Sequence, residues 1–177
     1  MAKASADTAA STASPASAGG QAERQRGIDP RGPRFGAGIT AVLLLVTIGL
    51  WLGGLTIAAF VVFAYITVVF AIGTFAGVQR HPYGLFFKKV IRPRLAPPAE
   101  LEDPTPPTFA QGVGLVITLV GLLLSLIPGV GLALPIAAAA AFIAAFLNSV
   151  FAYCLGCQIY LLLVRLGVLG RSHAASA

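Results

Sequence analysis

The only two cysteines of the chain, Cys154 and Cys157, stand as a Cys-x-x-Cys pair inside the apolar stretch AYCLGCQIY, residues 152–160. On a continuous helix their β-carbons would lie about 5–6 Å apart on one face. A disulfide needs about 3.5–4.5 Å, so closing one requires a local distortion, which Gly156 between the two cysteines permits. The pair is therefore a candidate catalytic pair for thiol redox exchange or sulfur relay.

Two other interpretations of the cysteine pair stay open. Reactive Cys-x-x-Cys pairs usually occupy a helix N-terminus, where the dipole lowers the thiol pKa, whereas apolar surroundings raise it. No helix-capping residue immediately precedes Cys154, so the two cysteines can also be inert small side chains that pack in an apolar region. A zinc site would need four ligands, so it would require a dimer or a further ligand such as His81. No metal site and no cofactor is predicted.

The composition places this pair in a membrane protein. Hydrophobic residues make up 57% of the 177 positions and charged residues 10%, against about 25% charged in average soluble domains. No charged residue lies between Arg34 and Arg80 or between Asp103 and Arg165. A spanning helix needs about 20 apolar residues, so each of these two runs can cross a bilayer twice.

The sequence predicts an all-α, polytopic membrane protein with four transmembrane helices in two hairpins and a short interfacial helix. Glycine and proline divide the two runs, at Gly53-Gly54 in the first and at Pro128 with its following glycines in the second. The membrane domain is expected to cover residues 27–171 after a disordered Ala/Ser-rich tail at 1–26. The expected spans are 37–53, 55–78, 109–127 and 135–156, with a polar loop at 79–108 and an interfacial or emergent helix at 158–171.

The fourth apolar run is too long to be a single span. Extended to Gly170 as one helix it would measure about 54 Å, against about 30 Å for the hydrocarbon core. Gly156 is the expected bend. Asn148, deep in this span, is expected to bond to another helix on a face away from the cysteines, and Gly114 and Gly121 of the third span are expected at close helix contacts. Thr108 and Gln111 fit a capping box at the start of the third span.

The polar loop carries a basic cluster formed by Lys88, Lys89, Arg92 and Arg94. In helical projection, up to Pro93, three of these cations oppose an apolar side, which predicts a short helix lying on the membrane surface. The cations are Lys88, Lys89 and Arg92, and the apolar side consists of Phe86, Phe87, Val90 and Ile91. The cluster can bind anionic lipid headgroups, or it can simply anchor the loop. Nucleic-acid binding is not expected, because topology explains the net charge of +6.

The distribution of Lys and Arg predicts the orientation. All 12 lie before the first span, in the loop or in the C-terminal segment, and none lies in the turns near Gly53 and Pro128. The positive-inside rule then places both termini and the loop in the cytoplasm. Arg31 and Arg34, beside Asp29, either pack against Glu102 and Asp103 of the loop or are independently solvated.

Four motifs carry a family resemblance. The chain resembles the bacterial membrane-protein family catalogued as domain of unknown function 4395 through IDPRGPRF (28–35), HPYGLFFKKVIRPRL (81–95), EDPTPPTFAQGVG (102–114) and CLGCQIYLLL (154–163). The resemblance implies a location in the bacterial plasma membrane. It also implies a thioredoxin-like or sulfurtransferase partner and raises the expectation of thiol or sulfur chemistry.

No other catalytic signature accompanies the cysteines. The chain has no Gly-rich phosphate loop, no His-Glu-x-x-His and no Asp, Glu, Lys, Arg or His within a span. The leading hypothesis is a membrane component of thiol-redox or sulfur handling that acts through Cys154 and Cys157. The alternative is a non-enzymatic membrane scaffold or small-solute channel with inert cysteines. Whether the protein is an enzyme, and whether it forms a homo-oligomer, stays open.

Overall fold

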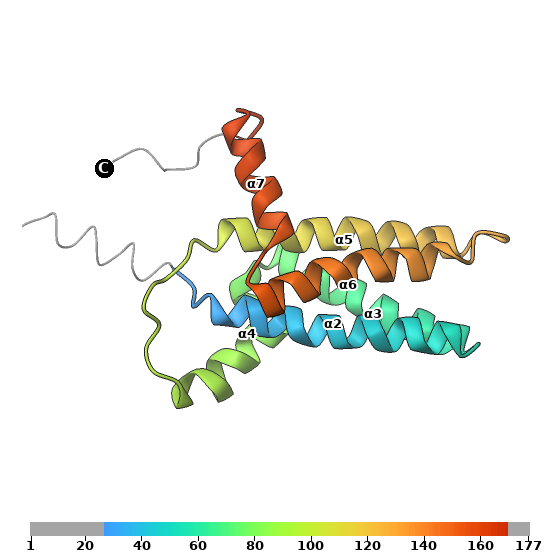
Figure 1. The fold of residues 1–177 in the computed structure, drawn as a ribbon, viewed down its shortest axis with the longest axis horizontal. Helices are drawn as coiled ribbons and strands as arrows, with labels where there is room; N and C mark the ends of the chain where they lie inside the picture. Colours follow the sequence, from blue (N-terminus) through green and yellow to red (C-terminus); the bar gives the residue numbers. More distant parts are fainter. Residues whose placement is uncertain (1–26, 170–177) are drawn as a thin grey trace, which may run out of the picture.

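Four long apolar helices form the body of the protein (Figure 1). The structure, a computed structural model, describes residues 27–169, and the predicted tail at 1–26 lies outside them. The long helices are α2 (Arg31–Leu52), α3 (Thr56–Phe75), α5 (Thr105–Ser125) and α6 (Ala133–Phe151), and each is long and apolar enough to cross a membrane. Shorter helices complete the described part, which contains no strand. The all-α prediction with four such helices is confirmed.

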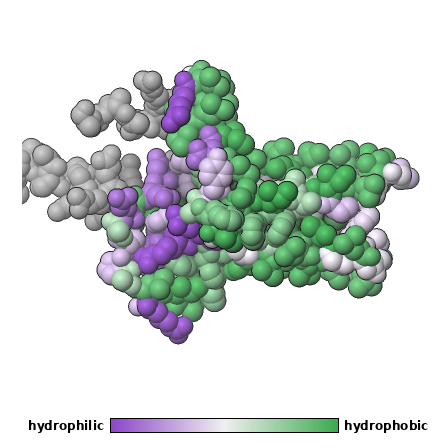
Figure 2. Space-filling view, viewed as in Figure 1, coloured by the Kyte–Doolittle hydropathy of each residue, from purple (hydrophilic) through white to green (hydrophobic). Residues whose placement is uncertain are grey.

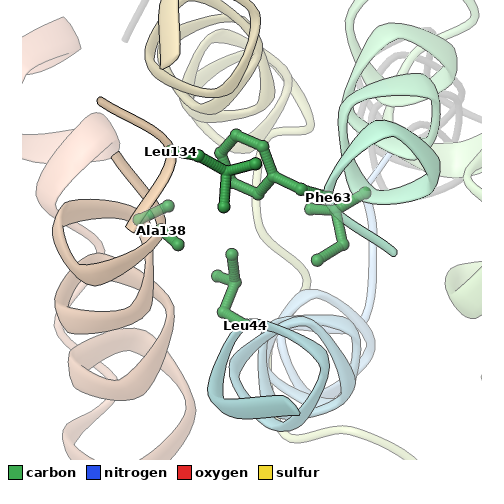
Figure 3. Close-up of a cluster of buried hydrophobic side chains, with 6 residues drawn as sticks. Leu44, Phe63, Leu134 and Ala138 are labelled. Atoms are coloured by element: carbon green, nitrogen blue, oxygen red, sulfur yellow. The ribbon is translucent and has the colours of Figure 1, made fainter. Parts of the chain in front are cut away.

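The four long helices pack as a closed bundle. Helix α2 packs on α3 and α6, and α5 likewise packs on α3 and α6, so each hairpin is held by the other. Buried side chains from three helices meet between them, namely Leu44, Phe63 and the α6 residues Leu134 and Ala138 (Figure 3). Only 17–33% of the most apolar stretch of each long helix is buried. The remaining apolar surface faces outward, as expected for a protein surrounded by lipid.

Small residues allow the helices to approach one another closely. A Cβ on Gly114 would overlap the ring of Phe70 in α3, and a Cβ on Gly121 would overlap Ala137 in α6. Both glycines therefore lie at helix contacts, as expected from the sequence. The buried threonines Thr40 and Thr67 donate their hydroxyl protons to the carbonyl oxygens four residues earlier, at 3.0 and 2.9 Å. These bonds satisfy the hydroxyls within their own helices.

The two ends of the bundle differ in polarity. Figure 2 shows the hydrophilic residues gathered at one end, over the loop and the short helices, while the opposite end is apolar. At the apolar end Gly54, with φ of 79°, closes the turn between α2 and α3. Glycine adopts this left-handed conformation without steric cost. The polar end carries α4 (Pro82–Phe86), which continues through a π-helical turn (Phe87–Ile91) to a 3-10 turn (Arg92–Arg94).

The helical arm at 82–94 is attached to the bundle through aromatic contacts. Phe87 is 4% exposed, and its ring lies 5.7 Å from that of Phe35 in α2. Phe86 stacks on the same ring at 6.2 Å but is half exposed. The two phenylalanines therefore do not share one membrane-facing side, because Phe87 anchors the arm and Phe86 covers its outer surface.

Two long helices begin several residues before the expected spans, for local reasons. Helix α2 begins at Arg31 rather than near residue 37, since the Asp29 carboxylate accepts a hydrogen bond from the backbone N–H of Arg31 at 3.0 Å. Helix α5 begins at Thr105 rather than 109, and Asp103 accepts from the backbone N–H of Thr105 at 2.8 Å. Short Asp side chains placed two residues upstream satisfy the otherwise unpaired first-turn amides.

Candidate functional site

The chain bends sharply between α6 and the cysteine pair. Helix α6 ends at Phe151, and Ala152 adopts a left-handed conformation with φ of 56°. The backbone N–H groups of Ala152 and Tyr153 both donate to the carbonyl oxygen of Leu147. Helix α7 (Leu155–Arg165) then leaves the bundle at a steep angle (Figure 1). The predicted bend at Gly156 is therefore wrong, because the helix breaks at residues 152–154.

The break places the cysteine pair at the N-terminus of α7. Cys154 is the N-cap residue, with extended backbone angles, and its Sγ accepts a hydrogen bond from the backbone N–H of Cys157 at 3.2 Å. Cys154 and Cys157 form a disulfide, and their Cα atoms lie 5.2 Å apart. The distortion that a disulfide requires is supplied by the helix break. The amide dipole and the N–H of Cys157 point at Cys154, an arrangement that favours a thiolate there.

Gly156 has a different role from the one expected. A Cβ at this position would lie 2.5 Å from Cβ and 2.6 Å from Cα of Ala110 in α5. Phe109 and Tyr160 extend the same helix contact, with ring centroids 5.6 Å apart. Glycine at 156 therefore lets the first turn of α7 rest directly on α5. This contact fixes the position of the disulfide relative to the bundle.

A cavity of about 580 Å³ opens beside the disulfide. It lies between α2, α5, α6 and the first turn of α7, and both cysteines line it. Asn148 also lines it, so the expectation that Asn148 lies away from the cysteine face is wrong. The helix break at residues 152–154 places both cysteines and Asn148 along the same cavity. Sequence reasoning on one continuous helix cannot find this arrangement.

Two further polar side chains line the cavity. Gln111 of α5 has a buried Oε1 with no hydrogen-bond partner among the described residues. His81 is 5% exposed, and burial lowers the pKa of its imidazole to about 4, so it is neutral at pH 7. The two lie together, because a Cβ on Gly73 would contact both of them at 2.9 Å. Gln111 is thus not part of a capping box, and Thr108 instead donates to the carbonyl of Pro104 at 2.7 Å.

Charged residues surround the polar mouth of the cavity. Arg31 donates to both carboxylate oxygens of Asp29 at 3.1 Å and to the carbonyl of Ala96 at 3.0 Å. Burial raises the pKa of Asp29, but the hydrogen bonds from Arg31 outweigh it and hold the pKa below its usual value. Ile28 and Glu102 exchange two backbone hydrogen bonds, each of 2.9 Å. The segment that precedes α2 is therefore tied to the loop through the backbone of Ile28, while Arg31 pairs with Asp29 rather than with Glu102.

The basic cluster of the loop is divided by the structure. Lys88 and Arg92 line the cavity mouth, whereas Lys89 and Arg94 are exposed outside it. Within residues 27–169 no three His, Cys, Asp or Glu side chains gather to hold a metal ion. His81 and Gln111 are the cavity residues for which sequence reasoning expected other roles. Their sequence signal is weak, since His81 directly follows the first charge-free run and Gln111 is a polar residue near the start of the second.

A comparison with known protein families gives one match. A family model described as "Domain of unknown function (DUF4395)" matches residues 28–165. No curated protein and no solved structure matches the chain.

Proposed function

The chain belongs to the DUF4395 family, and on that premise we propose that it is a membrane-embedded thiol–disulfide exchange protein. Cys154 and Cys157 cycle between a disulfide and a dithiol. The observation that carries this proposal is the position of the pair at the N-terminus of α7, with Cys154 as N-cap and its sulfur accepting the N–H of Cys157. Inert core cysteines have no need of this arrangement.

The hydrogen bond to Cys154 determines which of the two sulfurs is attacked and which one leaves. A thiolate of the partner attacks Sγ of Cys157, the Cys154–Cys157 bond breaks, and Cys154 leaves as a thiolate stabilised by the amide and the helix dipole. A second thiolate of the partner then attacks the partner's own sulfur in the mixed disulfide and releases Cys157. The partner becomes a disulfide, and its two electrons remain on the pair, with Cys154 as a thiolate and Cys157 protonated by water to a thiol. A soluble thioredoxin-like or sulfurtransferase protein fits the role of partner.

The proposed setting is the bacterial plasma membrane with the polar end of the bundle in the cytoplasm. Support comes from the charge asymmetry, since the apolar turns at Gly54 and Gly129 carry no Lys or Arg while the polar end carries the basic loop. The disulfide would then lie near the reducing side, where disulfides are usually transient and catalytic. This location supports cycling rather than a static cross-link.

The test is a redox titration of the purified protein. The full chain is equilibrated with mixtures of a reduced and an oxidised dithiol, trapped with acid, alkylated and analysed by mass spectrometry. We expect one reversible two-electron transition at Cys154 and Cys157, absent from the Cys154→Ser and Cys157→Ser variants. A disulfide that no dithiol reduces in the folded protein would refute the proposal and favour a scaffold or channel with inert cysteines.

A further inference from the structure

The cycle proposed above needs an acceptor for the electrons that the cysteine pair receives. Once a partner dithiol has been oxidised, Cys154 and Cys157 hold two extra electrons, as a thiolate and a thiol. Cycling resumes only when a second molecule removes them. The place for that molecule is marked by the cavity of about 580 Å³ that both cysteines line.

The inner walls of this cavity are apolar, and the small side chains of α6 leave its space open. Helix α6 contributes Ala141, Ala144 and Ala145, and Phe70 and Ile117 face them from α3 and α5. The volume lies within the range of about 300–1,000 Å³ typical of small-molecule sites. A site of this kind, in a bundle with an apolar outer surface, suits a lipophilic ring compound with an apolar tail.

Polar groups inside the cavity further narrow the choice of ligand. Gln111 presents a buried Oε1 that no described donor satisfies, together with an amide N–H₂. The neutral imidazole of His81 and the amide of Asn148 line the same space. Amide and imidazole N–H groups donate to a ring carbonyl, and Oε1 of Gln111 accepts from a ring hydroxyl. A lipid acyl chain would leave Oε1 unpaired.

We propose that this cavity binds a lipophilic quinone, which reoxidises the cysteine pair. The thiolate of Cys154 and the thiol of Cys157 form the S–S bond, and the two electrons reduce the quinone ring. One proton comes from the Cys157 thiol and one from water at the polar mouth, and these complete the two hydroxyl groups of the hydroquinone. The products are one disulfide and one hydroquinone for each dithiol and quinone. This inference rests on the proposed function and names its electron acceptor.

The experiment uses the reduced full-length protein in detergent without oxygen and a fully substituted benzoquinone with a short isoprenoid tail. Full substitution prevents thiols from adding to the ring. Hydroquinone is measured by absorbance and the disulfide by alkylation and mass spectrometry. We expect one hydroquinone per disulfide in the native protein and none in the Cys154→Ser variant.

Three variants locate the reaction. Gln111→Leu keeps the approximate volume but removes the hydrogen bonds, so KM for the quinone should rise roughly tenfold, as for the loss of a hydrogen bond. Ala144→Phe fills the cavity and should slow quinone reduction at least as much. Ala139→Phe, on the exposed face of α6 outside the cavity, is the matched control and should leave the rate unchanged.

Exchange with a soluble dithiol is measured on the same samples and separates the two proposals. Normal dithiol exchange without quinone reduction would overturn the quinone site and leave the proposed function standing. Equal quinone reduction in the Ala144→Phe and Ala139→Phe variants would also overturn it, because the reaction would then occur outside the cavity. If the native protein exchanges no electrons with the soluble dithiol, the proposed function fails, and the quinone site fails with it.

Discussion

The contact between Gly156 and Ala110 gives a sharp test of how the disulfide is held. In Gly156→Ala, the added Cβ would lie 2.5 Å from Cβ of Ala110, where ordinary contact begins at about 3.4 Å. The first turn of α7 must therefore move away from α5 by roughly 1 Å. Overpacking of this kind costs about 1–3 kcal/mol, and the better helix propensity of alanine returns up to about 1 kcal/mol. We expect a net loss of about 1–2 kcal/mol.

The matched control is Gly49→Ala in α2, where an added Cβ meets no atom within 4 Å. The chemical change is the same, and the expected effect is a gain of up to about 1 kcal/mol. Thermal unfolding in detergent measures both variants, and for a chain of this length each kcal/mol corresponds to about 2–4 °C in Tm. We also expect faster reduction of the disulfide by dithiothreitol in Gly156→Ala. Equal Tm values and equal reduction rates would refute the packing of α7 on α5.

Three further predictions concern the cap, the buried histidine and the loop cations. Cys154→Ser and Cys154→Ala both abolish the disulfide, but serine keeps an acceptor for the N–H of Cys157. The Cys154→Ser variant should therefore be about 1 kcal/mol more stable than Cys154→Ala in chemical unfolding. Equal stabilities would contradict the role of Cys154 as helix cap. Burial lowers the pKa of His81 to about 4, so the unfolded state binds a proton first as the pH falls. Stability should drop between pH 6.5 and 4 by up to about 3 kcal/mol, and His81→Gln should flatten this slope in unfolding curves measured across that range. Neutralising Lys89 or Arg94, exposed outside the cavity, should weaken the binding of anionic lipid to the detergent-solubilised protein by about 1 kcal/mol per charge. Unchanged binding would assign these residues to anchoring alone.

The four long helices could be predicted because lipid imposes a simple rule on composition. Two charge-free runs, each interrupted by a pair of small or helix-breaking residues, leave few alternatives to two hairpins. Close packing at Gly114 and Gly121 was predictable for a related reason, since small residues mark helix contacts in membranes. Hydropathy and residue size along the sequence are enough to predict these features.

The site could be predicted only in part, because tertiary contacts decide its geometry. The left-handed residue at the break is Ala152 rather than a glycine, and the sequence offers Gly156 as the more obvious hinge. Gly156 is instead needed for the contact with Ala110. Gln111 fits a local capping pattern with Thr108, but α5 starts earlier and turns Gln111 toward the cavity and His81. The cysteine motif was visible in the sequence, whereas its place at a helix N-terminus was not.

The Oε1 of Gln111, which no described donor satisfies, should lower the stability of the ligand-free protein. Removing a buried acceptor that lacks a partner relieves a penalty of about 1–3 kcal/mol, so Gln111→Leu should raise the Tm of the ligand-free protein. A residue that lowers stability in the empty cavity and improves binding in the filled one serves the ligand rather than the fold. A lower Tm in Gln111→Leu would show that Gln111 supports the fold instead.

The most direct test of the central claim is alkylation of Cys154 and Cys157 in sealed membrane vesicles of both orientations, with acid trapping and mass spectrometry. The account predicts that an added membrane-impermeant reductant and alkylating agent reach both cysteines only from the face that carries the basic loop. It also predicts that part of the pair is trapped as a disulfide before reduction. Two cysteines that remain reduced thiols and react from neither face would contradict it and identify them as packing residues.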